Sequence, residues 1–299
     1  MEPYKNILAV INREGNYRNT FLKSMYLSKQ SGAKLTLLDI HHKPGLFSKQ
    51  PAKLSANLKN HLSYKSEDEE LDELGIILKK NNVNFEIKQQ SSRQDYKGIL
   101  QTLNQDEYDL MVKDKATKHY THFGFKPSDD WHLLRDSSVP VMLVTQNKWH
   151  AAGHILSAIE TESQENSHLK VNQDILEHTY CLSELLKSDV HLLNCFLGES
   201  MSMAIESKPV INQKRLHLQH LASLSENQQY STPTLHVCEG LPEYGISELA
   251  EKYHANMVVL GTSEHASFIN NVTGHTSEYI IDKLDCDVLT IKSLIKVIH

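Results

Sequence analysis

The chain has 299 residues, of which 39% are hydrophobic and 23% are charged, and its formal net charge is −6. This balance argues against a general nucleic-acid-binding protein, which would carry a basic face, and no apolar stretch of the sequence is long enough to span a membrane. We therefore expect a cytoplasmic protein of about two domains, with no membrane contact and no direct nucleic-acid partner.

The first half of the chain alternates between short apolar runs and helical patterns. The opening run, NILAVIN, is typical of a buried strand. Four more runs rich in apolar and β-branched residues indicate further strands: 34–40, 85–89, 109–113 and 139–144. Between two of these runs, Leu71, Leu74 and Leu78 recur at helical spacing. Short bounded strands that alternate with helices predict a parallel sheet covered on both faces.

The same pattern begins again near His154. The segment HILSAIETES is followed by a helical stripe at spacings of four, seven and eleven residues, made of Ile175, Thr179, Leu182 and Leu186. Further on, ANMVVLGT matches YDLMVKDK, and EYIIDKLDCDVLTI matches WHLLRDSSVPVMLV. The second half therefore repeats the first.

The repeat has a constant offset. Aligning Leu8 with Ile155 gives 147 residues (155 − 8), and aligning Val141 with Val288 again gives 147 (288 − 141). We predict two tandem doubly wound, Rossmann-like α/β domains, 1–146 and 147–299, each with a mainly parallel five-stranded sheet. The segment between the two domains, residues 145–154, is short, and we call it the joint. Its length predicts that the domains pack through their last strands as an intramolecular pseudo-dimer. The chain would then be a monomer or a higher assembly of such pseudo-dimers.

The cysteines and histidines do not indicate a metal site. The four cysteines contain no C-x-x-C pair, so we expect buried thiols rather than a disulfide framework. His236 and Cys238 lie on one face of a predicted strand, but no second pair follows at zinc spacing. We expect no metal held by protein side chains alone.

Both ends of the repeat resemble the universal stress protein family. The resemblance rests on YKNILAVIN, on FKPSDDWHLLRDSSVPVMLV and on VVLGTSEHASFINNVTGHTSEYIIDKLDCDVLTIK, and it is strongest to tandem two-domain members. It implies a role in stress survival. Many members of the family bind ATP through G-x2-G-x9-G-[S/T], whose glycines let backbone N–H groups approach the phosphates.

The second copy keeps part of this motif. Gly261 matches the first glycine, Glu264 replaces the second, and Gly274 follows after nine intervening residues. His275 replaces the hydroxyl residue that follows the motif's last glycine. The strand-end acid, which in the family meets the ribose or a metal ion, is replaced by Glu160. The resemblance implies the following candidate nucleotide-binding residues: Glu160, Gly261, Thr262, Gly274, His275 and Thr276.

The first copy has lost more of the motif. By our alignment, Lys113 takes the place of Gly261 and Pro127 that of Gly274, with Ser128 and Asp129 starting the next helix. Proline has no N–H to give a phosphate. Asn12 stands where the strand-end acid would be. We therefore expect no nucleotide in the first copy.

Glu264 is the residue expected to weaken nucleotide binding by the second copy most. A carboxylate about 4 Å from a phosphate charge costs ~1 kcal/mol when solvated, unless Mg²⁺ lies between them. We expect a regulatory protein that binds ATP or ADP with Mg²⁺ weakly in the second domain. No catalytic motif is present, so we assign no catalytic residue. Two alternatives stay open: slow ATP hydrolysis on the same fold, and an amphiphilic ligand near the methionine-containing segment 197–211.

Overall fold

Strands and helices alternate along the whole chain. The computed structural model describes residues 4–13, 15–42, 67–116, 120–121, 124–125, 129–161, 166–197, 210–226, 232–262 and 276–292. The first half contains β1 (Asn6–Ile11), α1 (Tyr17–Ser31), β2 (Lys34–His42), α3 (Glu67–Lys80), β3 (Phe85–Ser92), α4 (Asp95–Gln105), β4 (Leu110–Asp114), β5 (Tyr120–Thr121), β6 (Gly124–Phe125), α5 (Asp129–Asp136) and β7 (Val141–Val144). The second half contains β8 (His154–Ala158), α6 (Asn166–Leu186), β9 (Asp189–Phe196), α7 (Val210–Ser225), β10 (Thr234–Glu239), α8 (Pro242–Lys252), β11 (Met257–Thr262), α9 (Thr276–Lys283) and β12 (Asp287–Lys292).

Ten of these strands form one continuous sheet, in the order β10-β9-β8-β11-β12-β7-β4-β1-β2-β3. Each half contributes five strands in the same order, and every pairing of this sheet within a half is parallel. The two halves meet where β7 pairs with β12 in antiparallel fashion. This confirms two tandem doubly wound α/β units that pack through their last strands. The short β5–β6 hairpin was not expected, and it has no counterpart among the described residues of the second half.

An approximate two-fold axis passes through the central strand pair. Met142 pairs with Leu289, and these residues are equivalent in the repeat because they lie 147 residues apart (289 − 142). The flanking pairs exchange with each other, since Val141 pairs with Thr290 and Leu143 with Val288. The offset of 147 is therefore correct for the last strand of each half.

The offset predicted for the first strand is wrong by one residue. β1 aligns Ile7 with Leu110, and β8 aligns Ile155 with Met257. Leu110 and Met257 are equivalent, so Ile7 rather than Leu8 is the counterpart of Ile155, at an offset of 148 (155 − 7). The chain from β8 to β11 is therefore one residue shorter than the chain from β1 to β4.

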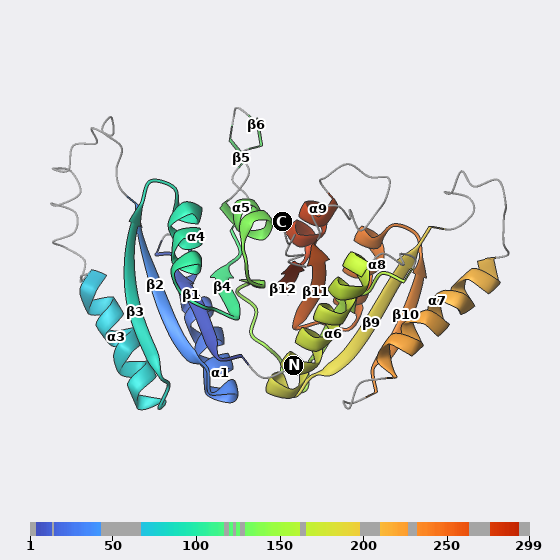
Figure 1. Ribbon diagram of the computed structural model, residues 1–299, viewed down its shortest axis with the longest axis horizontal. Coiled ribbons are helices and arrows are strands. Elements are labelled where there is room, and N and C mark those ends of the chain that lie inside the picture. Colours follow the sequence, from blue (N-terminus) through green and yellow to red (C-terminus); the bar gives the residue numbers. More distant parts are fainter. Residues whose placement is uncertain are drawn as a thin grey trace.

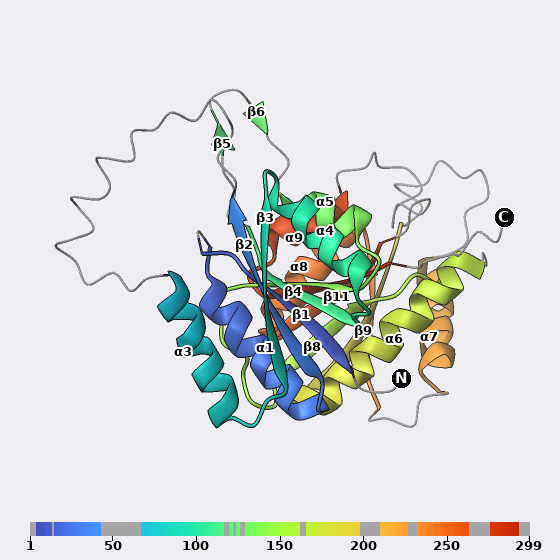
Figure 2. The ribbon, with the colours of Figure 1, turned by 60° about the vertical axis from the view of Figure 1, so that its left-hand side comes forward.

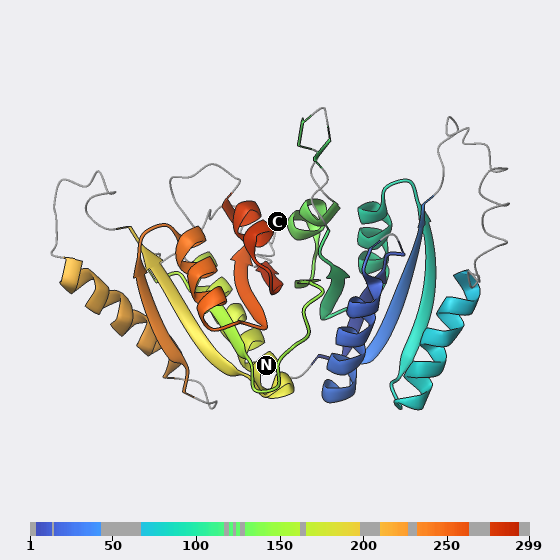
Figure 3. The ribbon, with the colours of Figure 1, turned by 180° about the vertical axis from the view of Figure 1, so that it is seen from behind.

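The sheet is covered by a layer of helices on each face (Figure 1). One layer contains α3, α1, α6 and α7, and the other contains α4, α5, α9 and α8. Alternate side chains of β1 enter the two cores, with Ile7 and Ile11 on the first face and Leu8 and Val10 on the second. The predicted helical stripes of α3 and α6 are buried in the first core. Seen from behind, α5 and α9 lie next to each other above the joint (Figure 3).

The joint between the halves is closed by packing and by polar contacts. Helices α1 and α6 pack against each other across it (Figure 2). The Tyr4 hydroxyl of the first half lies 2.8 Å from Nδ1 of His178 on α6, in a buried hydrogen bond. Trp149 packs edge-on against Tyr26, as expected for a residue at the joint, and Trp131 packs against the second core. No helix among the described residues is long and apolar enough to cross a membrane.

Candidate functional site

Strands β8 and β11 end side by side where the strand order of the second half reverses. Helix α6, which follows β8, and helix α9, which follows β11, cover opposite faces of the sheet, and in open α/β sheets ligands bind beyond the strand ends at such a point. Glu160 lies just beyond β8, and Gly261 and Thr262 end β11, so the register between the strands brings them to one edge. Helix α9 begins at Thr276. Three further residues of the predicted motif lie outside the described residues: Glu264, Gly274 and His275.

Glu160 is held by the first turns of α6. Its Oε2 lies 2.5 Å from Nδ1 of His168. Asn172 makes two hydrogen bonds to the backbone of Glu160. Its Oδ1 accepts the Glu160 N–H at 3.2 Å, and its Nδ2 donates to the Glu160 carbonyl at 2.5 Å. The candidate acid therefore has a fixed position at the strand end. Neither His168 nor Asn172 was predicted, although their spacing of four residues places them on one face of the helix.

More polar groups surround the same strand ends. Thr161 Oγ1 lies 2.9 Å from Nδ1 of His217 on α7, and the His217 ring stacks on Phe196 with centroids 4.6 Å apart. Asn194 on β9 donates to the Ile159 carbonyl at 2.8 Å. Its Oδ1 is buried and accepts no hydrogen bond from the residues that the structure describes. We call the following six residues the β8–β9 polar cluster: Glu160, Thr161, His168, Asn172, Asn194 and His217.

The polar cluster can bind an uncharged polar group better than a bare anion. Its carboxylate and carbonyl oxygens accept hydrogen bonds, and its imidazoles and hydroxyl can donate or accept them. A ribose or a base edge has donors for such oxygens. Phosphates would depend on the backbone around Gly261 and the start of α9. The predicted site therefore has two parts: the polar cluster, suited to a ribose or a base, and the backbone near Gly261 and the start of α9, suited to phosphates.

The first half has a different residue opposite Gly261 from the one predicted. Gly261 pairs with Ile291, and Asp114 pairs with Val144, which is equivalent to Ile291 at the offset of 147 (291 − 144). The counterpart of Gly261 is therefore Asp114, and the prediction of Lys113 is wrong because it placed β4 one residue too far along. Asn12 does correspond to Glu160, at the offset of 148 found for the first strands (160 − 12). Pro127 and Ser128 lie outside the described residues.

Three charged side chains lie together at the ligand end of the first half. Lys113 Nζ lies 3.0 Å from Asp130 Oδ1 and 3.3 Å from Asp114 Oδ1, and all three side chains are buried. Asp130 also accepts the Ala116 N–H at 2.7 Å, and Asp114 accepts the Asn16 N–H at 3.2 Å. Burial by itself lowers the pKa of Lys113, but Asp130 and Asp114 outweigh it and raise that pKa, so the lysine stays charged. We call these three residues the Lys113 cluster.

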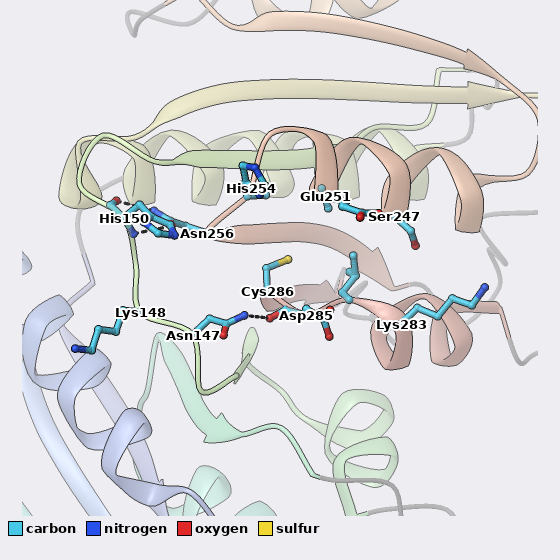
Figure 4. Close-up of a pocket in the computed structure, with 13 residues that line it drawn as sticks. Asn147, Lys148, His150, Ser247, Glu251, His254, Asn256, Lys283, Asp285 and Cys286 are labelled. Carbon is cyan, nitrogen blue, oxygen red and sulfur yellow. Dashed lines mark hydrogen bonds between the residues drawn. The ribbon is translucent and has the colours of Figure 1, made fainter.

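Two hollows lie near the contact between the two halves. One cavity of about 930 Å³ is bordered by the segments that follow β1, β4 and β7, including Asp114 and Thr145, and by Asp282 and Asp285. Another of about 560 Å³ lies beside Asn256, at the end of β11 opposite to Gly261 (Figure 4). Within the described residues, no three His, Cys, Asp or Glu side chains are arranged to hold a metal ion.

Comparisons with known proteins agree with this architecture. Residues 154–292 match the model of the Universal stress protein family. The whole chain is similar to "Universal stress protein E" of Photorhabdus laumondii, at 26% identity over 98% of this chain and 96% of the relative. It is also similar to the protein of that name from Escherichia coli (strain K12), at 28% identity over 98% and 95% of the two chains.

Two solved structures share the fold over almost the full length. A protein from Pseudomonas aeruginosa PAO1 whose function is unknown has a TM-score of 0.74 and 19% identity, and the match covers 97% of this chain and 93% of that one. A universal stress protein from Archaeoglobus fulgidus DSM 4304 has a TM-score of 0.66 and 15% identity, with 97% of both chains covered. At these identities the likeness shows the fold alone.

Proposed function

The chain is a tandem member of the universal stress protein family, and we propose from this premise that it is a cytoplasmic stress-response protein that binds a small ligand in its second half. The first candidate ligand is an adenine nucleotide, ATP or ADP with Mg²⁺, held weakly. The proposed site combines residues at the ends of β8 and β11 and at the start of α9: Glu160, Gly261, Thr262, Gly274, His275 and Thr276.

The difference between the two strand ends carries this proposal. In the first half the Lys113 cluster places a lysine and two carboxylates where a ligand would lie, and each charge already has a partner. In the second half the counterparts of Lys113, Asp114 and Asp130 are Leu260, Gly261 and Ser277, none of them charged. A ligand in the first half would have to compete with these buried ion pairs, whereas the three equivalent residues of the second half carry no charge and form none.

Titration calorimetry with ATP and MgCl₂ tests the proposal. We expect one site per chain, with weaker binding when Mg²⁺ is omitted. Glu160→Ala should weaken binding, and Asn12→Ala, the equivalent change in the first half, should leave it unchanged. Two equivalent sites per chain, or loss of binding in the Asn12 variant only, would contradict the assignment to the second half.

The charge at position 264 provides an independent test. Glu264→Gly removes the carboxylate and restores the glycine's backbone freedom, so it should tighten ATP binding by about 1–2 kcal/mol. Glu264→Gln removes only the charge and should recover part of that gain. If neither variant nor the parent binds ATP, the ligand is of another class, such as an amphiphile, and the parent should then be titrated with a fatty acid.

Slow ATP hydrolysis is the second candidate, and the contact between Glu160 and His168 favours it. A carboxylate that orients an imidazole is a common general-base arrangement. Phosphate release should then fall at least tenfold in His168→Asn, measured at saturating ATP so that a change in ATP affinity does not affect the result. Equal phosphate release by the parent and the variant would leave binding as the function.

A further inference from the structure

Cys195 and Cys238 occupy directly paired positions on neighbouring strands. Cys195 lies on β9 and Cys238 on β10, and the parallel register aligns the two residues. Paired residues of parallel strands point to the same face of a sheet, and both cysteines pack against the second core. Both are free thiols and both are partly exposed.

The spacing of the pair fits a disulfide. Neighbouring strands lie about 4.7–4.9 Å apart, and disulfides join Cα atoms that are about 4.4–6.8 Å apart. Helix α8 covers the pair with Gly245. A Cβ at that glycine would stand 2.9 Å from the Cys195 Sγ and 3.8 Å from the Cys238 Sγ. The two sulfurs therefore border the same small space, which the missing side chain of Gly245 leaves to them.

The charges around the two thiols differ. Burial raises the pKa of Cys195 to about 12, and the neighbouring Cys238 and the carboxylate of Glu243 add to the effect. Burial also raises the pKa of Cys238, with Glu248 adding to it, but Lys214 on α7 and Lys252 on α8 act in the opposite direction. Cations thus offset part of this rise at Cys238, and none among the described residues acts on Cys195, so Cys238 is the better nucleophile of the pair.

We propose that Cys195 and Cys238 form a reversible disulfide and that a hydroperoxide is the oxidant. The Cys238 thiolate attacks one oxygen of ROOH, the O–O bond breaks, and ROH leaves with the thiol proton. The sulfur of Cys195 then attacks the resulting sulfenic acid. The S–S bond forms, the S–O bond breaks, and hydroxide leaves with the Cys195 proton as water. Two electrons pass from the two sulfurs to the peroxide, and a dithiol reverses the change.

The disulfide would act on the outer edge of the sheet. Strand β10 is the edge strand of the second half, and the chain between β9 and β10 contains α7. Joining the two strands closes this segment into a covalent loop and pins the edge strand to its neighbour. The inference does not depend on nucleotide binding, because the thiols lie outside the proposed ligand site.

Thiol counting after treatment with hydrogen peroxide tests the proposal. The reduced chain has four thiols. After oxidation and denaturation in a thiol-labelling reagent, we expect two labelled thiols, a proteolytic fragment that joins the Cys195 and Cys238 peptides, and recovery of all four with dithiothreitol. Because both thiols are largely protonated near neutral pH, the rate should rise about tenfold per pH unit between pH 7 and pH 9.

Three variants separate this pair from general oxidation. Cys195→Ser should accumulate a sulfenic acid at position 238 that dimedone traps, and Cys238→Ser should give neither a crosslink nor a trapped adduct. Cys286→Ser, which changes another partly exposed cysteine, should still lose two thiols. Four labelled thiols after oxidation of the parent, a crosslink that involves Cys181 or Cys286, or loss that dithiothreitol does not reverse would overturn the proposal.

Discussion

Lys23 Nζ lies 2.7 Å from both carboxylate oxygens of Asp287, and this buried pair joins α1 of the first half to the start of β12 in the second. Asp287 also accepts the Thr145 N–H at 2.8 Å and the Trp149 Nε1–H at 2.8 Å. Burial lowers the pKa of Lys23 and raises that of Asp287, so removal from water disfavours both charged forms. The contacts offset that cost only while every partner is present.

Lys23→Met should destabilise the chain by about 3–5 kcal/mol, because it leaves the Asp287 carboxylate buried without its cation. Lys29→Met changes an exposed lysine of the same helix and should cost less than about 0.5 kcal/mol. Urea denaturation measures both. In the double variant Lys23→Met with Asp287→Asn, the loss should be smaller than the sum of the two single losses. A Lys23 variant as stable as the Lys29 variant would refute the prediction.

Acid should destabilise the protein between pH 6.5 and pH 4, and two buried histidines are the reason. Burial lowers the pKa of His178 to about 4, and it does the same to His191, assisted by His236 and His154. Below pH 6.5 these two imidazoles become protonated in the unfolded chain, whereas in the folded chain they stay neutral down to about pH 4. Each shift therefore removes about 3 kcal/mol as the pH falls through this window, and none further below pH 4.

The measurement is the urea midpoint at pH 7, 6, 5 and 4. His178→Gln removes one of the two groups and should flatten the pH dependence by up to about 3 kcal/mol. His191 lies in a row with His154 and His236, at nitrogen–nitrogen distances of 2.9 Å on either side, so its variants would disturb three rings at once. Equal urea midpoints at pH 7 and pH 5 would show that burial does not lower the pKa of either imidazole.

Lys113→Met should also cost about 3–5 kcal/mol, because it leaves Asp114 and Asp130 buried without their cation. The triple variant Lys113→Leu, Asp114→Gly and Asp130→Ser installs the residues of the second half and should lose less than the single variant. Chemical denaturation compares the two. A triple variant that is less stable than the single one would mean that the carboxylates stabilise the first half by themselves.

Two neighbouring residues near the joint should respond in opposite directions to a change of side chain. A Cβ at Gly153 would stand 2.1 Å from the Asn256 Nδ2, which donates to the His150 carbonyl at 2.9 Å. Gly153→Ala should therefore cost about 1–3 kcal/mol. Ala152 has a φ of 52°, so Ala152→Gly should stabilise by up to about 1 kcal/mol. Thermal melts of the two variants should shift to opposite sides of the parent.

The sequence predicts the repeat and the strands well, because buried parallel strands are short apolar runs and α3 and α6 carry clear helical stripes. It misplaces Leu8 by one residue, since periodicity alone does not fix register and a one-residue change in a connecting segment leaves the pattern intact. It also misplaces Lys113 by one residue, although the match of YDLMVKDK to ANMVVLGT places Asp114 opposite Gly261. The contact between Glu160 and His168 was beyond the sequence because it depends on where α6 begins. The Lys113 cluster was missed because Asp130 lies far along the chain from its partner.

The two-fold axis through Met142 and Leu289 has a genetic consequence. In a dimer of identical chains, any codon change alters both subunits, so a residue cannot be lost on one side and kept on the other. Fusing the halves into one reading frame removes that constraint while the shared sheet keeps them together. Lys113 can therefore coexist with Leu260 at the equivalent position. Each half can acquire its own substitutions, so one half can become purely structural while the other remains free to bind a ligand.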